Sequence, residues 1–149
     1  MQDLPHHYAV TANGKSDTNI TLSSPGLPDL DTAGPPEFGG PGDVWSPETL
    51  LVGAVADCFI LSFRATARAA RLEWDALSCS VIGTLDKIDR VTQFTAFEIT
   101  AELTVPASSD DKADDEKALR LMEKAKKHCL VTNSFKAATT LRASVLVSD

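Results

Sequence analysis

The chain has 149 residues, a net charge of -7, 43% hydrophobic and 23% charged residues. This length fits one domain, so we expect residues 1–149 to fold as a single unit. The apolar content excludes a disordered chain, and the acidic balance argues against binding nucleic acid or an anionic membrane surface. The longest apolar stretch, 50–63, is shorter than the roughly 20 residues of a membrane span. Residues 1–10 lack the features of a signal peptide, which predicts a cytoplasmic protein with reduced cysteines.

The N-terminal third divides into a hairpin and a long loop. Residues 6–22 alternate like two short strands around an Asn13-Gly14 turn, with the second strand at about Thr18–Leu22. Residues 23–44 are rich in glycine and proline, which predicts a loop without regular structure. Because so little chain precedes this loop, we expect a functional flap rather than a linker between domains.

A helix is predicted to begin at Ser46 and to run to about Arg71. Ser46 is a suitable N-cap, Pro47 suits the first helical position, and Glu48 lies near the positive end of the helix dipole. Residues 50–63 are apolar on nearly every side, so we expect protein to surround this part of the helix.

The second half of the chain contains further strand and helix patterns. Alternation of apolar and polar residues predicts strands at about 78–87, 97–103 and 141–147. Residues 110–128 begin with acidic and end with basic side chains, as the dipole of a second helix favours. Its apolar stripe is formed by Ala118, Met122 and Ala125, and Cys129 continues that spacing.

Two of the three cysteines occupy comparable places on the two helices. Cys58 shares a stripe of the first helix with Ala54, Leu61 and Ala65, and Cys129 ends the stripe of the second. If the two stripes pack together, the thiols could meet, which requires Cα atoms within about 7 Å. A cysteine in an apolar helix is more often a small hydrophobic residue, and Cys79 in its strand is interpreted as a core residue.

The remaining candidates are interpreted structurally when each is taken alone. Glu48 is then an acid that stabilises a helix N-terminus, and His128 a cation at a helix C-terminus. His6 and His7 point to opposite faces of a strand, and no cysteine–histidine spacing predicts a metal site. These residues therefore do not predict a metal site.

Taken together, several of these segments resemble the OsmC/Ohr family of thiol-dependent hydroperoxide reductases. The resemblance lies in Pro-Glu at a helix start, Cys-Phe ten residues later, and a second cysteine after the next long helix, and is carried by 45–51, 56–59 and 128–134. The loop 35–42 is similar as well, and the similarity extends from about residue 8 to the end. It implies an α+β, OsmC-like fold, in which antiparallel sheets wrap around two long central helices of an intertwined homodimer.

The resemblance also implies chemical roles. By position, Cys58 matches the peroxidatic thiol, Cys129 the resolving thiol, and Glu48 the acid that pairs with an activating arginine. The implied enzyme is an antioxidant stress-response peroxidase that reduces organic hydroperoxides and is restored by an external dithiol, without a cofactor. The alternative is a protein of this fold that binds a ligand or senses redox state, with the 23–44 loop covering a pocket. A third interpretation is a structural dimer with inert thiols.

Helix geometry predicts how the acid and the thiol are arranged. Ten residues of helix separate Glu48 from Cys58, about 15 Å of rise, so they cannot touch within one helix. If two copies pack antiparallel and cross near Gly53, Glu48 lies level with Cys58 of the partner subunit. We therefore expect shared active sites and an incomplete site in a monomer.

One position departs from the family pattern. The activating arginine of the family comes from the N-terminal region, but this chain has no arginine before Arg64. The matching residue is Lys15 or Glu37, depending on the alignment. Lysine keeps the charge and loses the planar fork that holds a carboxylate at two points, whereas glutamate reverses the charge.

Overall fold

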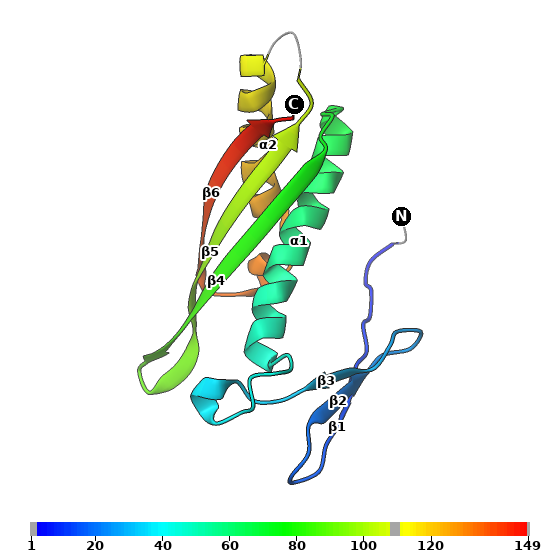
Figure 1. Ribbon diagram of the computed structural model, residues 1–149, viewed down its shortest axis with the longest axis vertical. Helices are drawn as coiled ribbons and strands as arrows, with labels where there is room; N and C mark the ends of the chain where they lie inside the picture. Colours follow the sequence, from blue (N-terminus) through cyan, green and yellow to red (C-terminus); the bar gives the residue numbers. More distant parts are fainter. Residues whose placement is uncertain (1–2, 108–110, 149) are drawn as a thin grey trace. The chain divides into compact units, whose positions relative to one another are not determined.

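The structure is a computed structural model that describes residues 3–107 and 111–148, with side chains from residue 114 in the second stretch (Figure 1). Its contacts divide the chain into two compact units, residues 1–50 and 51–149. The chain contains two α-helices and two three-stranded sheets, which confirms the α+β class.

The first unit contains a small antiparallel sheet. Its strands are β1 (Thr11–Asn13), β2 (Ile20–Ser23) and β3 (Leu30–Thr32), in the order β1-β2-β3. The pairing of two strands on either side of Gly14 is confirmed, because Asn13 pairs with Thr21. The predicted first strand is wrong in its extent, since residues 6–10, with His6 and His7, belong to no strand. The turn is longer than predicted, since β2 begins at Ile20 rather than at Thr18.

The prediction that 23–44 has no regular structure is wrong at two places. β3 pairs along β2, and a short 3-10 turn, η1, covers Pro36–Phe38. The hydroxyl of Thr21 donates to the carboxylate of Asp31 at 2.9 Å across the β2–β3 pair. The glycines and prolines of this segment predicted a loop, but hydrogen bonds to the neighbouring strand β2 make residues 30–32 a strand. Sequence alone does not reveal this pairing.

The first helix, α1 (Pro47–Ala70), begins and ends close to the predicted residues. The hydroxyl of Ser46 accepts a hydrogen bond from the backbone N–H of Thr49 at 3.1 Å, and the hydroxyl of Thr49 accepts one from the N–H of Ser46 at 2.8 Å. This reciprocal capping satisfies two donors that a helix start leaves free. Arg71 follows the helix with φ 52°, the left-handed conformation that commonly ends helices.

The second unit is built on a three-stranded sheet of order β4-β5-β6. β4 (Ala76–Ile88) and β5 (Val91–Val105) are antiparallel and joined by a two-residue turn, Asp89-Arg90, whose positive φ values suit a tight hairpin. β6 (Ala138–Val147) runs parallel to β5. The sheet is therefore mixed, where the resemblance implied antiparallel pairing.

The two parallel strands, β5 and β6, are connected by a helix that crosses one face of the sheet. α2 (Asp111–His128) connects β5 to β6, and parallel neighbours require a crossover of this kind. The predicted helix and the three predicted strands are confirmed, although each strand is longer than its pattern. The predicted helix start at Asp110 lies outside the described residues.

Both helices of the second unit cover one face of this sheet (Figure 1). β5 alternates between buried residues that face the helices and exposed residues such as Glu98 and Glu102. The core comprises Val55, Phe59, Phe63 and Ala67 of α1, Phe97, Ile99, Ala101 and Leu103 of β5, and Ala118, Leu121, Met122 and Ala125 of α2.

The opposite side of α1 is not covered within one chain. Leu61 is 50% exposed, and Asp57, Arg64 and Ala65 are exposed beside it. The expectation that protein surrounds this helix therefore fails for the single chain. By length and composition alone α1 could cross a membrane, with 28% of that stretch buried, but the core helix of a soluble protein meets the same criterion.

Gly83 of β4 provides a test of the contact between α1 and the sheet. A Cβ atom at this position would come within 2.7 Å of Val52 of α1 and 2.9 Å of the Phe94 ring. We expect Gly83→Ala to lower the free energy of unfolding by about 1–3 kcal/mol through overpacking. Urea denaturation measures this change.

The matched control is Gly34→Ala, where an added Cβ meets nothing within 4 Å. Equal stability of the two variants would contradict the tight contact between α1 and β4.

Candidate functional site

The two predicted redox cysteines are brought together by the packing of both helices on the same sheet face. Cys58 lies at the edge of the buried face of α1 and is half-buried, next to the fully buried Phe59. Cys129 directly follows α2 and is fully buried. Both are free thiols, and Cys58 is close enough to Cys129 to raise the pKa of the Cys129 thiol.

The surroundings of Cys129 keep its thiol protonated. Burial raises its pKa, hydrogen bonds from the side chain and backbone of Thr132 lower it, and the neighbouring Cys58 raises it again, with a net upward shift. The Thr132 hydroxyl also donates to the Cys129 carbonyl at 3.1 Å. Cys129 therefore remains a neutral thiol at a pH at which an unburied cysteine begins to ionise.

The way in which the thiols meet differs from the predicted packing of two stripes. Of the predicted stripe on α1, Leu61 and Ala65 are exposed and Ala54 is only partly buried, so the stripe as a whole is not buried against α2. Cys58 reaches Cys129 because it lies at the border between the exposed side and the buried side. On α1 itself, its Sγ lies 4.0 Å from the Oγ of Ser62.

Cys79 of β4 faces the core, as predicted. It is partly buried and packs against the hydrophobic cluster. Burial, and after it the charge of Cys129, raises the pKa of Cys79 to about 11. A thiol with this pKa is almost wholly protonated near neutral pH, which fits a structural residue.

Glu48 is the second residue of α1, and one oxygen of its carboxylate is buried without a hydrogen-bond partner among the described residues. Because α1 is continuous from Pro47 to Ala70, ten residues of helix separate Glu48 from Cys58, about 15 Å of rise. The two side chains therefore do not form one site within a single helix, as predicted. A buried carboxylate oxygen without a partner is costly, so this group needs a donor from elsewhere.

The two candidates for the missing arginine lie on exposed turns. Lys15 lies in the turn between β1 and β2, where its backbone N–H donates to the Thr18 hydroxyl at 3.3 Å. Glu37 is exposed within η1. The alignment of this position therefore stays open between them.

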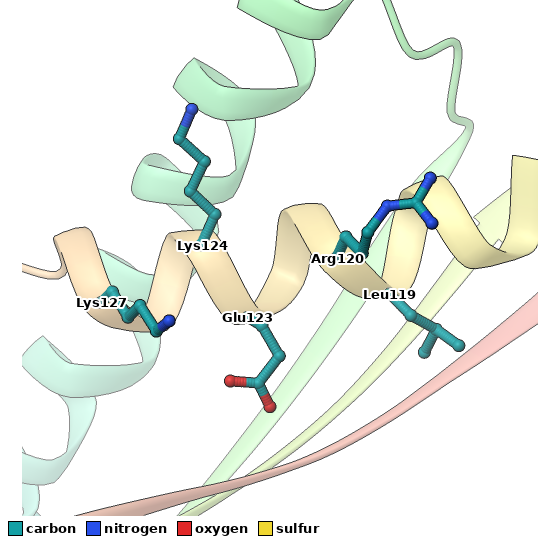
Figure 2. Close-up of a pocket in the computed structure, with 5 residues that line it drawn as sticks. All are labelled: Leu119, Arg120, Glu123, Lys124 and Lys127. Atoms are coloured by element: carbon teal, nitrogen blue, oxygen red, sulfur yellow. The ribbon is translucent and has the colours of Figure 1, made fainter.

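One pocket is lined by residues of α2, and neither Cys58 nor Cys129 lines it. It has a volume of about 430 Å³ and is lined by residues of α2, namely Leu119, Arg120, Glu123, Lys124 and Lys127 (Figure 2). None of the predicted site residues lines it. Within residues 3–107 and 111–148, no three histidine, cysteine or acidic side chains gather in a way that could hold a metal ion.

Sequence reasoning missed two polar neighbours of the thiols. Ser62 follows Cys58 by four residues, which places both on one side of a helix, and this spacing could have identified it. Thr132 lies in the short turn η2 (Thr132–Ser134), whose geometry no local pattern predicts.

Comparison with known proteins places the chain among OsmC-like proteins. The family model described as OsmC-like protein matches residues 40–144. The uncharacterised protein YmaD of Bacillus subtilis is 28% identical over 145 residues, covering 95% of both chains.

Solved structures share the fold. An OsmC-like protein of unknown function from Vibrio cholerae superposes with a TM-score of 0.84 at 15% identity, covering 94% of this chain and 100% of the other. An organic hydroperoxide resistance protein OsmC from Legionella pneumophila gives 0.71 at 23% identity, covering 96% and 98%.

The raised pKa of Cys79 predicts the pH dependence of its modification. Since the shift favours the neutral thiol, we expect alkylation of Cys79 in the folded protein to be slow at pH 8 and to rise between pH 9 and 11. Iodoacetamide labelling followed by peptide mass spectrometry measures this rate. Unfolded protein in urea is the control, in which Cys79 should label at the ordinary pH of a cysteine. Rapid labelling of folded Cys79 at pH 8 would contradict the inert role.

Proposed function

Because the chain belongs to the OsmC-like family, whose model matches residues 40–144, we propose that it is a thiol-dependent peroxidase that reduces organic hydroperoxides. One observation carries the proposal: half-buried Cys58 lies beside the fully buried Cys129. The Legionella pneumophila neighbour is named an organic hydroperoxide resistance protein, which agrees with this activity. A reducing cytoplasm is the proposed location, since the cycle requires reduced thiols at rest.

The cycle needs only the two thiols, the peroxide and a reductant. The Cys58 thiolate attacks the outer oxygen of the O–O bond, the sulfur takes that oxygen, and the alkoxide leaves and takes a proton to become an alcohol. The Cys129 thiol then condenses with the Cys58 sulfenic acid, forming a disulfide and releasing water. An external dithiol reduces the disulfide by thiol–disulfide exchange, and both cysteines are restored.

Electrostatics support the assignment of the two roles. The pKa of Cys129 is raised, first by burial, so it holds its proton and can donate toward a neighbouring thiolate. Cys58 is the more accessible of the two, since Cys129 is fully buried. A peroxide therefore meets Cys58 first, and Cys129 acts from within the core.

The proposed working form is a homodimer with shared sites. The uncovered side of α1 displays apolar and small residues, among them Leu61 and Ala54, which a second helix would bury. The carboxylate of Glu48 has a buried oxygen in need of a donor. In an antiparallel pair crossing near Gly53, it lies level with the thiol of Cys58 of the partner subunit.

Lys15 is the proposed cation of the site. It follows the Asn13-Gly14 turn and keeps the positive charge of the arginine in the family pattern. An ammonium group can neutralise a carboxylate such as that of Glu48, although it lacks the planar fork of arginine.

The absence of an arginine before Arg64 favours a second candidate function. A protein of this fold with a weakly activated thiolate would serve better as a redox sensor or a ligand-binding protein than as a fast peroxidase. The measured rate of peroxide consumption separates the two functions, because a sensor reacts once without sustained turnover.

Substitution of each cysteine tests the proposed cycle. We expect Cys58→Ser to abolish consumption of cumene hydroperoxide with dithiothreitol as reductant. Cys129→Ser should complete one turnover and then accumulate sulfinic acid at Cys58, because no thiol traps the sulfenic acid. Peroxide assays and peptide mass spectrometry measure both results. Normal cycling of Cys129→Ser would contradict its resolving role, and Cys79→Ser is the control expected to cycle normally.

Substitution of the charged residues tests the proposed dimeric site. We expect Glu48→Gln and Lys15→Met each to lower the rate of peroxide reduction about 10-fold or more, as loss of a charged hydrogen bond does. Lys15→Arg should restore or raise the rate, since arginine holds a carboxylate at two points. The control is Glu73→Gln, which removes an exposed acid beyond α1. If Glu48→Gln and Glu73→Gln retain equal activity, Glu48 has no part in the site.

A further inference from the structure

Ser62 lies one turn of α1 after Cys58, and its hydroxyl is in contact with the thiol. The Sγ of Cys58 and the Oγ of Ser62 are 4.0 Å apart, within hydrogen-bonding range for sulfur, and both side chains are half-buried. A serine or threonine in a helix commonly bonds to a carbonyl of the preceding turn instead. Thr66, one turn further along, does so: its hydroxyl donates to the carbonyl of Phe63 at 2.9 Å.

A hydroxyl at this place has a chemical use. A hydrogen bond donated to a charged group favours the charged form, and it is stronger than a hydrogen bond between neutral groups. The chain has no arginine before Arg64 to supply positive charge to the thiolate. Either group can donate in this contact while Cys58 is a thiol, but a thiolate has no proton, so Ser62 is the donor once Cys58 has ionised. Cys129 approaches from the end of α2.

We propose that Ser62 is a positioning residue that donates a hydrogen bond to the Cys58 thiolate and holds its sulfur beside Cys129. The proposal rests on the proposed function, because it assigns the hydroxyl a part in preparing Cys58 for attack. The hydroxyl undergoes no covalent change, and its proton stays on oxygen throughout the cycle.

The test measures the reactivity of Cys58 without any peroxide. The rate of Cys58 alkylation by iodoacetamide is followed from pH 5 to 10 by peptide mass spectrometry of the full-length protein. Ser62→Ala should slow alkylation of Cys58 at pH 7 about 10-fold, because the thiolate loses the hydrogen bond from the hydroxyl. Ser62→Thr keeps the hydroxyl and should restore the wild-type rate and profile.

A matched control separates this role from a general loss of packing. Thr66→Val removes a hydroxyl from the same helix that bonds to the carbonyls of Phe63 and Leu121 rather than to a thiol. It should leave the alkylation profile of Cys58 unchanged. An unchanged profile in Ser62→Ala, an equal effect of Thr66→Val, or failure of Ser62→Thr to rescue would each overturn the proposal.

Failure of the proposed function gives a different pattern from failure of this inference. If the wild-type protein consumes no peroxide but Ser62→Ala still slows alkylation, the peroxidase assignment falls and Ser62 keeps its effect on the thiolate. If peroxide is consumed at the same rate by wild type and Ser62→Ala, with equal alkylation profiles, the peroxidase assignment stands and Ser62 has no positioning role.

Discussion

The packing of α1 on one face of the mixed sheet is the constraint on which the rest of the structure depends. Burial of large side chains such as Phe59 and Phe63 contributes about 1.5–3 kcal/mol each, and it fixes the rotation of the helix about its axis. Cys58 adjoins Phe59 in sequence, so this rotation places its thiol at the border of the buried face. There the side chain is only half-buried, between the core and the exposed side of the helix.

The parallel pairing of β5 and β6 supplies the second thiol. Because the two strands run in the same direction, α2 must cross the sheet between them, and its C-terminal end carries Cys129 into the core. Burial then raises the pKa of Cys129, although Thr132 opposes the shift. One topological feature therefore determines both the nearness of the two thiols and the burial that raises the pKa of Cys129. In the proposed homodimer, a second subunit would cover the exposed side of α1 and could supply a donor to the Glu48 oxygen that has no hydrogen-bond partner among the described residues.

Local patterns predicted those parts of the fold that local interactions determine. The cap at Ser46, the position of the turn after Asn13 and the alternation of β5 each depend on residues close in sequence. Each is confirmed, although the turn is longer than predicted. The formation of β3 and the direction of β6 depend on pairing with a neighbouring strand, which local patterns do not reveal. β3 was missed because it lies in a segment rich in glycine and proline. For the candidate site, the family resemblance predicted Cys58 and Cys129, and the structure brings these two cysteines close together. Two neighbours of the thiols, Ser62 and Thr132, were not predicted. The place of Thr132 beside Cys129 is set by the turn after α2, whose geometry no local pattern predicts.

The central claim is that Cys58 and Cys129 form a disulfide when a hydroperoxide is reduced. The most direct measurement is mass spectrometry of the reduced, unlabelled protein after one equivalent of cumene hydroperoxide. The account predicts a loss of two hydrogen atoms within seconds and a Cys58–Cys129 linked peptide. Thiols that remain free after minutes would contradict it.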